Sequence, residues 1–181
     1  MCKVMNQVVI NGITFTCKHS RPFKDYCYNE REGAYLYIRN DTSVAIYKTI
    51  EVHIPGDDFE ALKTAFVIVS NVYNEFSDLL SKAKIYITKD YASVDYDKIT
   101  MTFGKDYAKV EGYGVSLVMP FEVKVFKKLR EFLIRTVKFL MSDEFKQLKK
   151  LVIKSSKVLN GEKEEEILTE LGEKFIKEVI E

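Results

Sequence analysis

One short segment alternates tyrosine and arginine with apolar residues, and this pattern could do binding chemistry. Successive side chains of an extended strand point to opposite faces, so Tyr35, Tyr37 and Arg39 share one face while Leu36 and Ile38 share the other. Aromatic rings offer surfaces on which bases stack, and cationic groups follow a phosphate backbone. The alternation therefore predicts a strip on the polar face of a sheet that can bind a single-stranded nucleic acid.

The same residue types recur at other positions that the sequence places in strands. Tyr86 lies between two isoleucines, and Tyr107 and Lys109 alternate with apolar residues. The chain has 11 tyrosines and no tryptophan, which suits rings that keep a hydrated hydroxyl on a half-exposed sheet. Ordinary sheet surface is the competing explanation, because tyrosine favours strands and pairs across them whatever the function. The residues predicted to contact nucleic acid are Tyr35, Tyr37, Arg39, Lys48, Tyr86, Tyr107 and Lys109.

The sequence offers little material for catalysis. His19 and His53 are the only histidines, and His53 shares a strand face with Glu51, with which it could pair. No phosphate-cradling glycine loop, nucleophile elbow or helical pair of metal ligands is present. The sequence thus predicts a non-enzymatic protein with no catalytic residue and no cofactor. A metal-dependent nuclease remains an open alternative, because the ligands of such sites are scattered in sequence.

Two carboxylate pairs could serve in catalysis, and Cys17, His19 and Cys27 could bind zinc. Helix capping and turn formation explain the carboxylates, and the odd number of cysteines argues against a secreted disulfide framework. Cys17, His19 and Cys27 match no standard zinc spacing, so no metal site is predicted. A Cys17–Cys27 disulfide across a hairpin stays open, since intracellular disulfides occur in hyperthermophiles. The carboxylate pairs are Asp57 with Asp58 and Asp95 with Asp97, and the remaining cysteine is Cys2.

Composition limits the class of protein. The net charge of +1 gives no global attraction to nucleic acid of the histone kind. Lysine greatly outnumbers arginine and glutamine is scarce, a bias that resembles thermophile proteins. The chain shows no secretory leader and no apolar run of about 18 residues. We therefore expect a soluble, cytoplasmic protein that has no membrane partner.

Charge is uneven towards the C-terminus. Residues 121–160 carry 11 Lys/Arg against 4 Asp/Glu, a net +7, whereas residues 161–181 carry 3 against 8, a net −5. These stretches can be two solvated helix faces that attract each other. They also suit a second hypothesis, in which residues 143–181 dock a partner or form a dimer. The protein would then be an interaction module, for instance an accessory protein of a virus or plasmid from a thermophilic archaeon.

Strand patterns and helical patterns follow one another twice along the chain. Asn11-Gly12 predicts a tight turn or a bulge. The polar segment 19–32 with its proline predicts a long loop or an irregular hairpin tip. Phe59, Leu62 and Phe66 begin a helical stripe that either of two preceding aspartates can cap. Ser142 can cap a further helix. Residues 7–17 form a strand-like segment of two apolar runs on either side of Asn11-Gly12. The other predicted strands are residues 34–39, 44–54, 84–88, 98–103, 107–111 and 115–119.

These patterns predict an α+β fold in which one unit occurs twice. Each unit is an antiparallel sheet of about four strands followed by one long helix, ββββα, and a C-terminal helical hairpin completes the chain. The predicted domains are residues 1–83 for the first repeat, 84–142 for the second and 143–181 for the helical extension.

One local motif resembles a known superfamily. Gly114-Val115-Ser116-Leu117, followed by Pro120, Phe121-Glu122 and Phe126-Lys127-Lys128-Leu129, is similar to the last strand and helix start of the positive cofactor four coactivators. The repeated architecture over residues 8–140 resembles the wider superfamily, which includes Whirly proteins and Pur-alpha. The resemblance implies single-stranded-DNA binding, although the lysine-rich motif of plant Whirly proteins is absent here.

Long apolar helices need a second layer to cover them. Two sheets with helices on one face commonly obtain that layer from each other or from another subunit. We therefore expect a homo-oligomer, with a dimer as the simplest case, that binds single-stranded nucleic acid. Salt should weaken such binding, because phosphate contacts release counterions.

Overall fold

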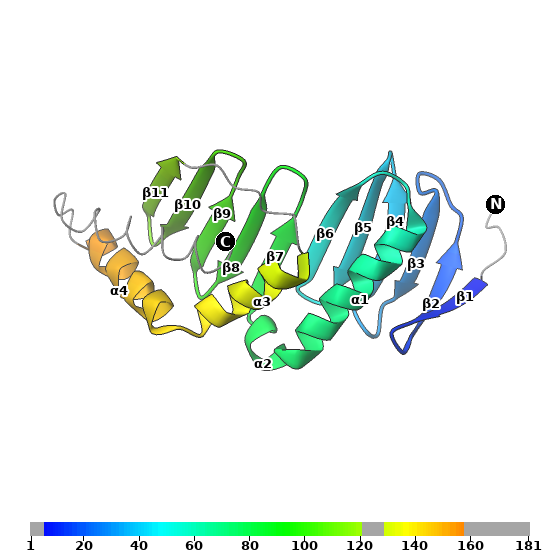
Figure 1. Ribbon diagram of the computed structural model, residues 1–181, viewed down its shortest axis with the longest axis horizontal. Helices are drawn as coiled ribbons and strands as arrows, with labels where there is room; N and C mark the ends of the chain where they lie inside the picture. The colour runs from blue at the N-terminus through cyan, green and yellow to red at the C-terminus, as the bar shows by residue number, and fades with distance from the viewer. Residues whose placement is uncertain (1–5, 121–128, 158–181) are drawn as a thin grey trace. The chain divides into compact units, whose positions relative to one another are not determined.

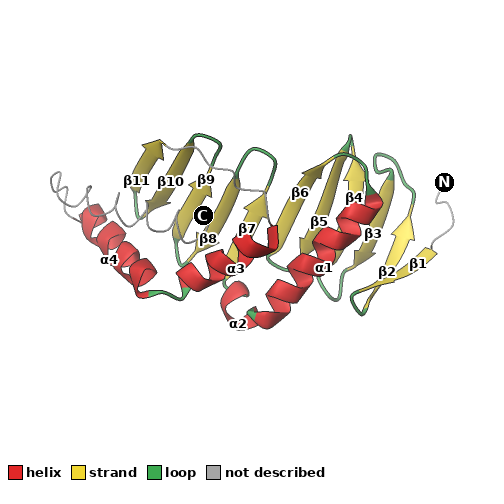
Figure 2. Cartoon of the chain, viewed as in Figure 1, coloured by secondary structure: helices red, strands yellow, loops and turns green. Residues whose placement is uncertain are grey.

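The computed structural model describes residues 6–120 and 129–157, which form eleven strands and four helices (Figure 1, Figure 2). The strands are hydrogen-bonded into one mixed sheet in which their order follows the sequence from β1 to β11. Every pairing with a described register is antiparallel except that between β6 and β7, which is parallel. The chain is therefore a long meander with one crossover.

The elements before the crossover are β1 (Asn6–Ile10), β2 (Ile13–Lys18), β3 (Asp25–Asn29), β4 (Ala34–Arg39), β5 (Thr42–Tyr47), β6 (Ile50–Pro55), α1 (Phe59–Glu75) and α2 (Ser77–Leu80). Those after it are β7 (Ala83–Ile87), β8 (Ala92–Tyr96), β9 (Ile99–Phe103), β10 (Tyr107–Gly112), β11 (Val115–Pro120), α3 (Leu129–Leu140) and α4 (Asp143–Lys157).

The predicted fold class, two ββββα repeats followed by a helical hairpin, is wrong. Six strands precede α1 and five more precede α3, and all eleven belong to one sheet. The predicted loop 19–32 contains β3, the predicted strand 44–54 is the hairpin of β5 and β6, and β8 was missed altogether. Within the predicted extension 143–181, the structure describes only α4, and residues 158–181 lie outside the described part.

The chain divides into two compact units. The first comprises residues 1–81 with 85–89, and the second comprises residues 82–84 with 90–181. The parallel strand β7 reaches the first unit through backbone pairing, in which Ile85 lies opposite Ile50 and Ile87 opposite Val52.

In the first unit α1 lies across one face of β4, β5 and β6 (Figure 1). Asp58 caps this helix, as predicted, by accepting hydrogen bonds from the backbone N–H groups of Glu60 and Ala61. Phe66 of α1 is fully buried, and its ring centroid lies 5.1 Å from that of Phe15 on β2. Apolar burial under α1 therefore fixes which face of the sheet is inner and which is outer.

The second unit is built in the same manner from β8 to β11 and two helices. Phe132 of α3 meets Phe103 of β9 with ring centroids 6.5 Å apart. Phe139 of α3 meets Phe145 of α4 at 5.7 Å, across the bend between the two helices. Ser142 occupies that bend and accepts a hydrogen bond from the backbone N–H of Phe145, which confirms the predicted cap.

Candidate nucleic-acid interface

Four tyrosines form a block on the face of the first unit opposite α1. Tyr26 and Tyr28 come from β3, Tyr35 and Tyr37 from β4, and the register sets Tyr26 opposite Tyr37 and Tyr28 opposite Tyr35. Ring centroids are 6.1 Å apart for Tyr26 and Tyr37, whose planes differ by 23°, and 5.5 Å apart for Tyr26 and Tyr28. We call these four residues the tyrosine platform.

The platform forms because β3 and β4 alternate strictly. On the face beneath α1 the same strands bury Cys27, Leu36 and Ile38, which are at most 2% exposed. All four platform tyrosines are only half-buried. No described helix or strand of the first unit packs over their face, so the rings reach solvent.

Partial burial favours the neutral form of two platform phenols. Burial raises the pKa of the Tyr26 phenol above its ordinary value. The pKa of Tyr37 is also raised, mainly by burial and further by the nearby carboxylate of Glu51. Neutral phenols do not repel phosphate, and they can donate hydrogen bonds to it.

Two cations flank the platform. The Lys18 ammonium lies 5.5 Å from the ring centroid of Tyr26 and 5.6 Å from that of Tyr28, which are cation–π distances. Arg39 is exposed at the end of β4, on the same strand face as Tyr37. The platform therefore combines stacking surfaces with positive charge at two of its margins.

A fifth ring reaches the platform from the connection between β2 and β3. The centroid of Phe23 lies 4.9 Å from that of Tyr26 and 5.3 Å from that of Tyr37. Phe23 itself is half-buried. One end of the platform is thus covered by a side chain that does not belong to its strands.

An imidazole–carboxylate pair lies on the same sheet face, on β6. His53 Nε2 is 2.8 Å from an oxygen of Glu51, as the sequence suggested, and its ring centroid is 4.8 Å from that of Tyr86 on β7. Glu51 lies opposite Tyr86 in the parallel pairing. Tyr86 therefore belongs to the outer face, as predicted, but its neighbour there is His53 and not a platform tyrosine.

Lys48 lies away from the other predicted residues of the first unit. It occupies the turn between β5 and β6 with a φ of 54°. Its ammonium is 5.3 Å from the ring centroid of Tyr47 and 5.2 Å from that of Tyr73 of α1. Because Tyr47 packs beneath α1, Lys48 lies on the helix-covered side of the sheet.

Tyr107 and Lys109 share one face of β10 in the second unit. A Cβ built on Gly104 would overlap the Tyr107 ring, so this ring packs closely on the glycine backbone. Lys109 pairs with Glu111 at 3.1 Å. The neighbouring outer positions of β9 are Thr100 and Thr102. This part of the sheet therefore carries hydroxyls and paired charges in place of an aromatic cluster.

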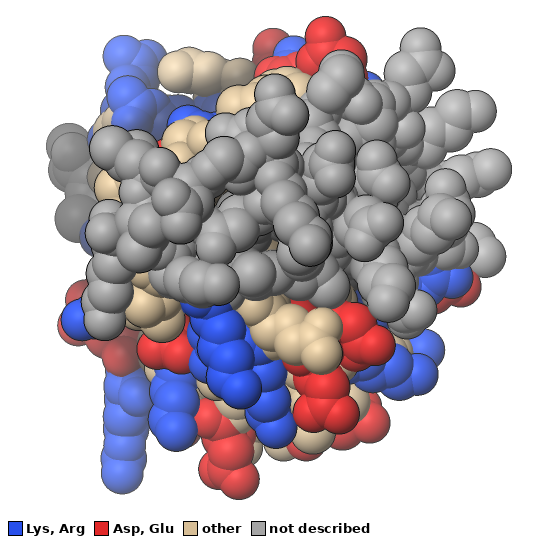
Figure 3. Space-filling model, turned by 90° about the vertical axis from the view of Figure 1, so that its left-hand side faces the viewer, with Lys and Arg blue, Asp and Glu red and all other residues tan. Residues whose placement is uncertain are grey.

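The side of the molecule that carries β11 and α4 shows basic and acidic side chains interspersed where it is described (Figure 3). On α4, Lys146 lies 3.7 Å from Asp143, and Lys149 lies 2.7 Å from Asp97 of the turn after β8. Lys149 also lies 5.3 Å from the ring centroid of Phe145. Opposite charges therefore offset one another on this surface, and no basic strip comparable to a phosphate track results among its described residues.

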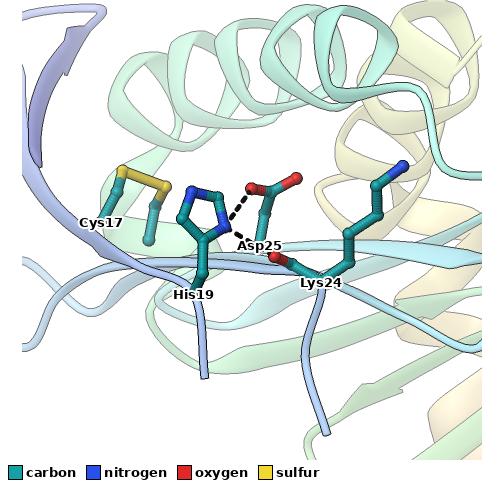
Figure 4. Close-up of a disulfide and its surroundings, with 5 residues drawn as sticks. Cys17, His19, Lys24 and Asp25 are labelled. Atoms are coloured by element: carbon teal, nitrogen blue, oxygen red, sulfur yellow. Dashed lines mark hydrogen bonds and ion pairs between the residues drawn. A yellow bond between two sulfur atoms is a disulfide. The ribbon is translucent and has the colours of Figure 1, made fainter. Parts of the chain in front are cut away.

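A disulfide joins the strands beside the platform. Cys17 and Cys27 are opposite each other on β2 and β3 and are bonded (Figure 4). Next to it, His19 Nδ1 is 3.0 Å from a carboxylate oxygen of Asp25 and 2.8 Å from the backbone oxygen of Lys24. The ammonium of Lys24 contacts Asp57 at 2.8 Å. Cys17, Cys27 and His19, the possible zinc ligands, are thus engaged in a disulfide and in contacts with Asp25 and Lys24.

The carboxylates have structural roles. Asp58 caps α1, Asp57 binds Lys24, Asp97 binds Lys149, and Asp95 accepts a hydrogen bond from the Thr100 hydroxyl at 3.3 Å. Over residues 6–120 and 129–157, no group of three or more histidine, cysteine, aspartate or glutamate side chains could hold a metal ion. In the same ranges no helix has both the length and the apolar character needed to cross a bilayer.

Sequence reasoning found half of the platform. Tyr35 and Tyr37 were predicted, whereas Tyr26, Tyr28 and Phe23 were missed because their segment was predicted to be a loop. The signal was present as the alternation Asp-Tyr-Cys-Tyr-Asn, with an apolar Cys27 between two rings.

Comparison with known proteins does not identify the chain. No family model, no curated protein and no solved structure matches it.

Proposed function

We propose that the protein binds single-stranded nucleic acid on the tyrosine platform, without catalysing a reaction. The observation that carries this proposal is the block of four half-exposed rings on two adjacent strands with Lys18 and Arg39 at its margins. Sequence-tolerant binding of a single strand needs these two ingredients, rings for the bases and cations for the phosphates. Bases in a duplex are already stacked and paired, so their faces cannot lie on such a surface.

The proposed contact residues differ from those that the sequence indicated. Three of the earlier residues remain, namely Tyr35, Tyr37 and Arg39. Three residues are added because they lie next to these on the platform: Tyr26, Tyr28 and Lys18. Lys48, Tyr86, Tyr107 and Lys109 are left out. Lys48 lies on the helix-covered side of the sheet, Tyr86 neighbours His53 and not the platform, and the other two belong to the second unit. The proposal depends on the platform and not on the Whirly-type resemblance, which implied a repeated ββββα unit.

Fluorescence anisotropy with labelled oligo-dT, a matched RNA and a duplex tests the proposal. We expect salt-sensitive binding of the single strands in the nanomolar to low micromolar range, and much weaker binding of the duplex. Removing both rings in Tyr35→Ala/Tyr37→Ala should weaken oligo-dT binding by about 10-fold or more, because each base–ring stack contributes about 1–3 kcal/mol. No binding of oligo-dT or RNA at low salt would disprove the proposal.

A matched control removes an exposed ring elsewhere. Tyr113 is 40% exposed in the turn between β10 and β11, where its φ is 53°. Asparagine tolerates that conformation, so Tyr113→Asn removes the ring at little cost in strain. Affinity for oligo-dT should stay unchanged in this variant. A second platform variant, Tyr35→Thr/Tyr37→Thr, keeps high strand propensity and separates loss of rings from loss of folding.

The edge strand β1 supports a homo-oligomer as the second part of the proposal. Among the described strands it pairs with β2 alone, its sequence Asn-Gln-Val-Val-Ile carries no charge or proline, and Val9 is 67% exposed. Such an edge is a template for pairing with another strand. Two copies of β1 can pair antiparallel about a two-fold axis.

The variant Val9→Lys tests this assembly. A lysine on an edge strand opposes strand addition but is tolerated by the fold, since position 9 is exposed. Light scattering should show a dimer for the wild type and a monomer for Val9→Lys. Substitution of the exposed Lys84 by glutamate is the charge-changing control, and it should leave the mass unchanged. A monomeric wild type would remove this part of the proposal.

A further inference from the structure

We propose that Phe23 fills a subsite of the tyrosine platform that takes one unpaired nucleobase, so that a bound strand replaces the Phe23 ring with a base. This inference rests on the proposed function and names the position at which one base binds. Phe23 comes from the connection between β2 and β3, whereas the rings beneath it come from the strands themselves. Its ring centroid is 4.9 Å from that of Tyr26 and 5.3 Å from that of Tyr37.

The subsite accepts a flat six-membered ring, because it already holds one. Tyr26 and Tyr37 face each other across β3 and β4 with ring planes 23° apart, and Phe23 packs against both. Its plane is tilted by 46° to Tyr26 and by 68° to Tyr37. These are ordinary aromatic contacts with no hydrogen bond in them. A pyrimidine base, or the six-membered part of a purine, offers a planar face of the same size.

The connection that carries Phe23 is anchored on both sides of the ring. On one side, the Lys24 backbone N–H donates to the Ile38 carbonyl at 2.9 Å, and the Lys24 ammonium contacts Asp57 at 2.8 Å. On the other side, the Cys17–Cys27 disulfide holds the end of β2 against β3. These anchors keep the platform strands in register whether or not the Phe23 ring lies on them.

Between the anchors, Phe23 is held mainly by its ring. Its backbone N–H donates to the Ser20 carbonyl at 2.8 Å, which is a bond within the turn itself. Arg21 and Pro22 next to it are exposed, and Phe23 is half-buried. The ring can therefore leave the platform by movement of this turn without opening the core under α1.

Two alternatives differ in their consequence for affinity. If a base replaces Phe23, the protein's own ring competes with the ligand, and its removal strengthens binding. If Phe23 is a fixed wall against which a base stacks, its removal weakens binding. The structure favours replacement, because Phe23 already covers parts of both Tyr26 and Tyr37.

Anisotropy titrations of Phe23→Ala with labelled oligo-dT distinguish these cases. We expect Phe23→Ala to bind about 2- to 10-fold more tightly than the wild type, the range that corresponds to one aromatic pair. The number of nucleotides covered per protein, from stoichiometric titration, should be the same for the variant and the wild type, because a base occupies the subsite in both complexes. Unchanged or weaker binding would overturn the inference.

Phe59→Ala is the matched control. Phe59 is half-buried at the start of α1, beside Lys63, and lies away from the platform. Its affinity for oligo-dT should equal that of the wild type. An equal gain in both variants would mean that loosening of the fold, and not a vacated subsite, strengthens binding, and it would also overturn the inference.

A second measurement uses the wild-type protein and needs no variant. Nuclear Overhauser contacts between the Phe23 ring and the rings of Tyr26 and Tyr37 should disappear when oligo-dT saturates the protein. Persistence of these contacts in the complex would disprove replacement, while leaving the proposed function intact. If neither the wild type nor Phe23→Ala bound any single strand, both proposals would fall together.

Discussion

At the scale of single residues, a few side chains give the outer face of β3 and β4 its aromatic surface and its positive charge. Tyrosine at four alternating positions supplies rings, and burial raises the pKa of Tyr26 and Tyr37 above the ordinary value. Positive charge comes from Lys18, which lies over two of the rings, and from Arg39, which is exposed. Their different positions predict different effects on binding.

Arg39→Gln is expected to lower the salt dependence of oligo-dT binding. Each phosphate contact with a single strand contributes a slope of about −0.7 to the plot of log affinity against log salt. Loss of one contact should reduce the magnitude of the slope by about 0.7 and weaken binding most at low salt. The measurement is a set of anisotropy titrations at four salt concentrations. Arg135→Gln, on α3 of the second unit, should leave the slope unchanged.

The pair of Lys24 and Asp57 predicts a specific dependence of stability on pH. The hydrogen bond and charge of Lys24 hold the pKa of Asp57 below its usual range, and Asp57 raises the pKa of Lys24. The Asp57 contribution is present above its unfolded pKa of about 3.9 and is lost as pH falls through the lower folded value. The Lys24 contribution is present below its unfolded pKa of about 10.4 and is lost as pH rises through the higher folded value.

Asp57→Asn should therefore lower the melting temperature slightly at neutral pH and not at about pH 2, below the unfolded pKa of aspartate. Both groups are fully exposed, so added salt should also shrink the difference. Thermal melts at pH 2 and pH 7, with and without salt, make the measurement. Asp106→Asn, an exposed aspartate of the second unit, is the control. A difference that persisted unchanged at pH 2 would contradict this account.

At the scale of elements, sequence patterns predicted the features that depend on a few neighbouring residues, namely helix caps, a turn and the face of a strand. The aspartate before α1 and the serine before α4 cap their helices as expected. Asn11 and Gly12 have φ values of 51° and 80°, which suit the predicted tight turn between β1 and β2. Tyr35 and Tyr37 lie on the outer face, as their alternation indicated. These features depend on a few neighbouring residues, so one sequence suffices to find them.

The two hairpins that the sequence did not predict, β5–β6 and β8–β9, turn at lysine residues, which do not favour turns. The β5–β6 hairpin turns at Lys48 with a φ of 54°, and the β8–β9 hairpin turns at Asp97 and Lys98 with φ values of 52° and 65°. Lysine rarely adopts this left-handed conformation, so Lys48 and Lys98 carry no turn signal, and Asp97 is the one turn-favouring residue of these three. Strand pairing offsets the conformational cost of the left-handed backbone at these turns. Pairing over a whole sheet cannot be predicted from a local pattern. The fold class was wrong for this reason.

The disulfide gives a prediction that belongs to the β2–β3 pair. A bond closing a loop of this size typically contributes about 2–4 kcal/mol by restricting the unfolded chain. Replacing both cysteines, in Cys17→Ala/Cys27→Ala, should lower the free energy of unfolding by about that amount. Urea denaturation of the wild type with and without dithiothreitol should show the same difference. The double variant should not respond to the reductant, and a response would show that another cysteine is involved.

At the scale of the whole molecule, the sheet is a meander interrupted once. Strands adjacent in sequence are adjacent in the sheet, and only the β6–α1–α2–β7 crossover pairs strands in parallel. Ile85 and Ile87 of β7 are each 2% exposed and lie opposite Ile50 and Val52. The first unit therefore draws its last strand from beyond the crossover.

A fragment of residues 1–89 should fold by itself, whereas a fragment of residues 1–81 should not. The shorter fragment loses two buried isoleucines, each of which contributes about 1.5–3 kcal/mol. Their sum is comparable with the whole stability of a small domain, which is about 5–15 kcal/mol. Circular dichroism during heating should show a cooperative transition for residues 1–89 only. Equal cooperativity in both fragments would contradict this role of β7.

The sequential order of the strands has a consequence for synthesis. A strand that pairs with its predecessor finds that partner already outside the ribosome, and the β2 to β6 hairpins can close one after another during translation. Among the described strands, β6 waits longest for its second neighbour, until the 29 residues from Pro55 to Ala83 have emerged and α1 has folded back. The speed of translation over this stretch therefore sets how long the unpaired edge of β6 is accessible to other chains.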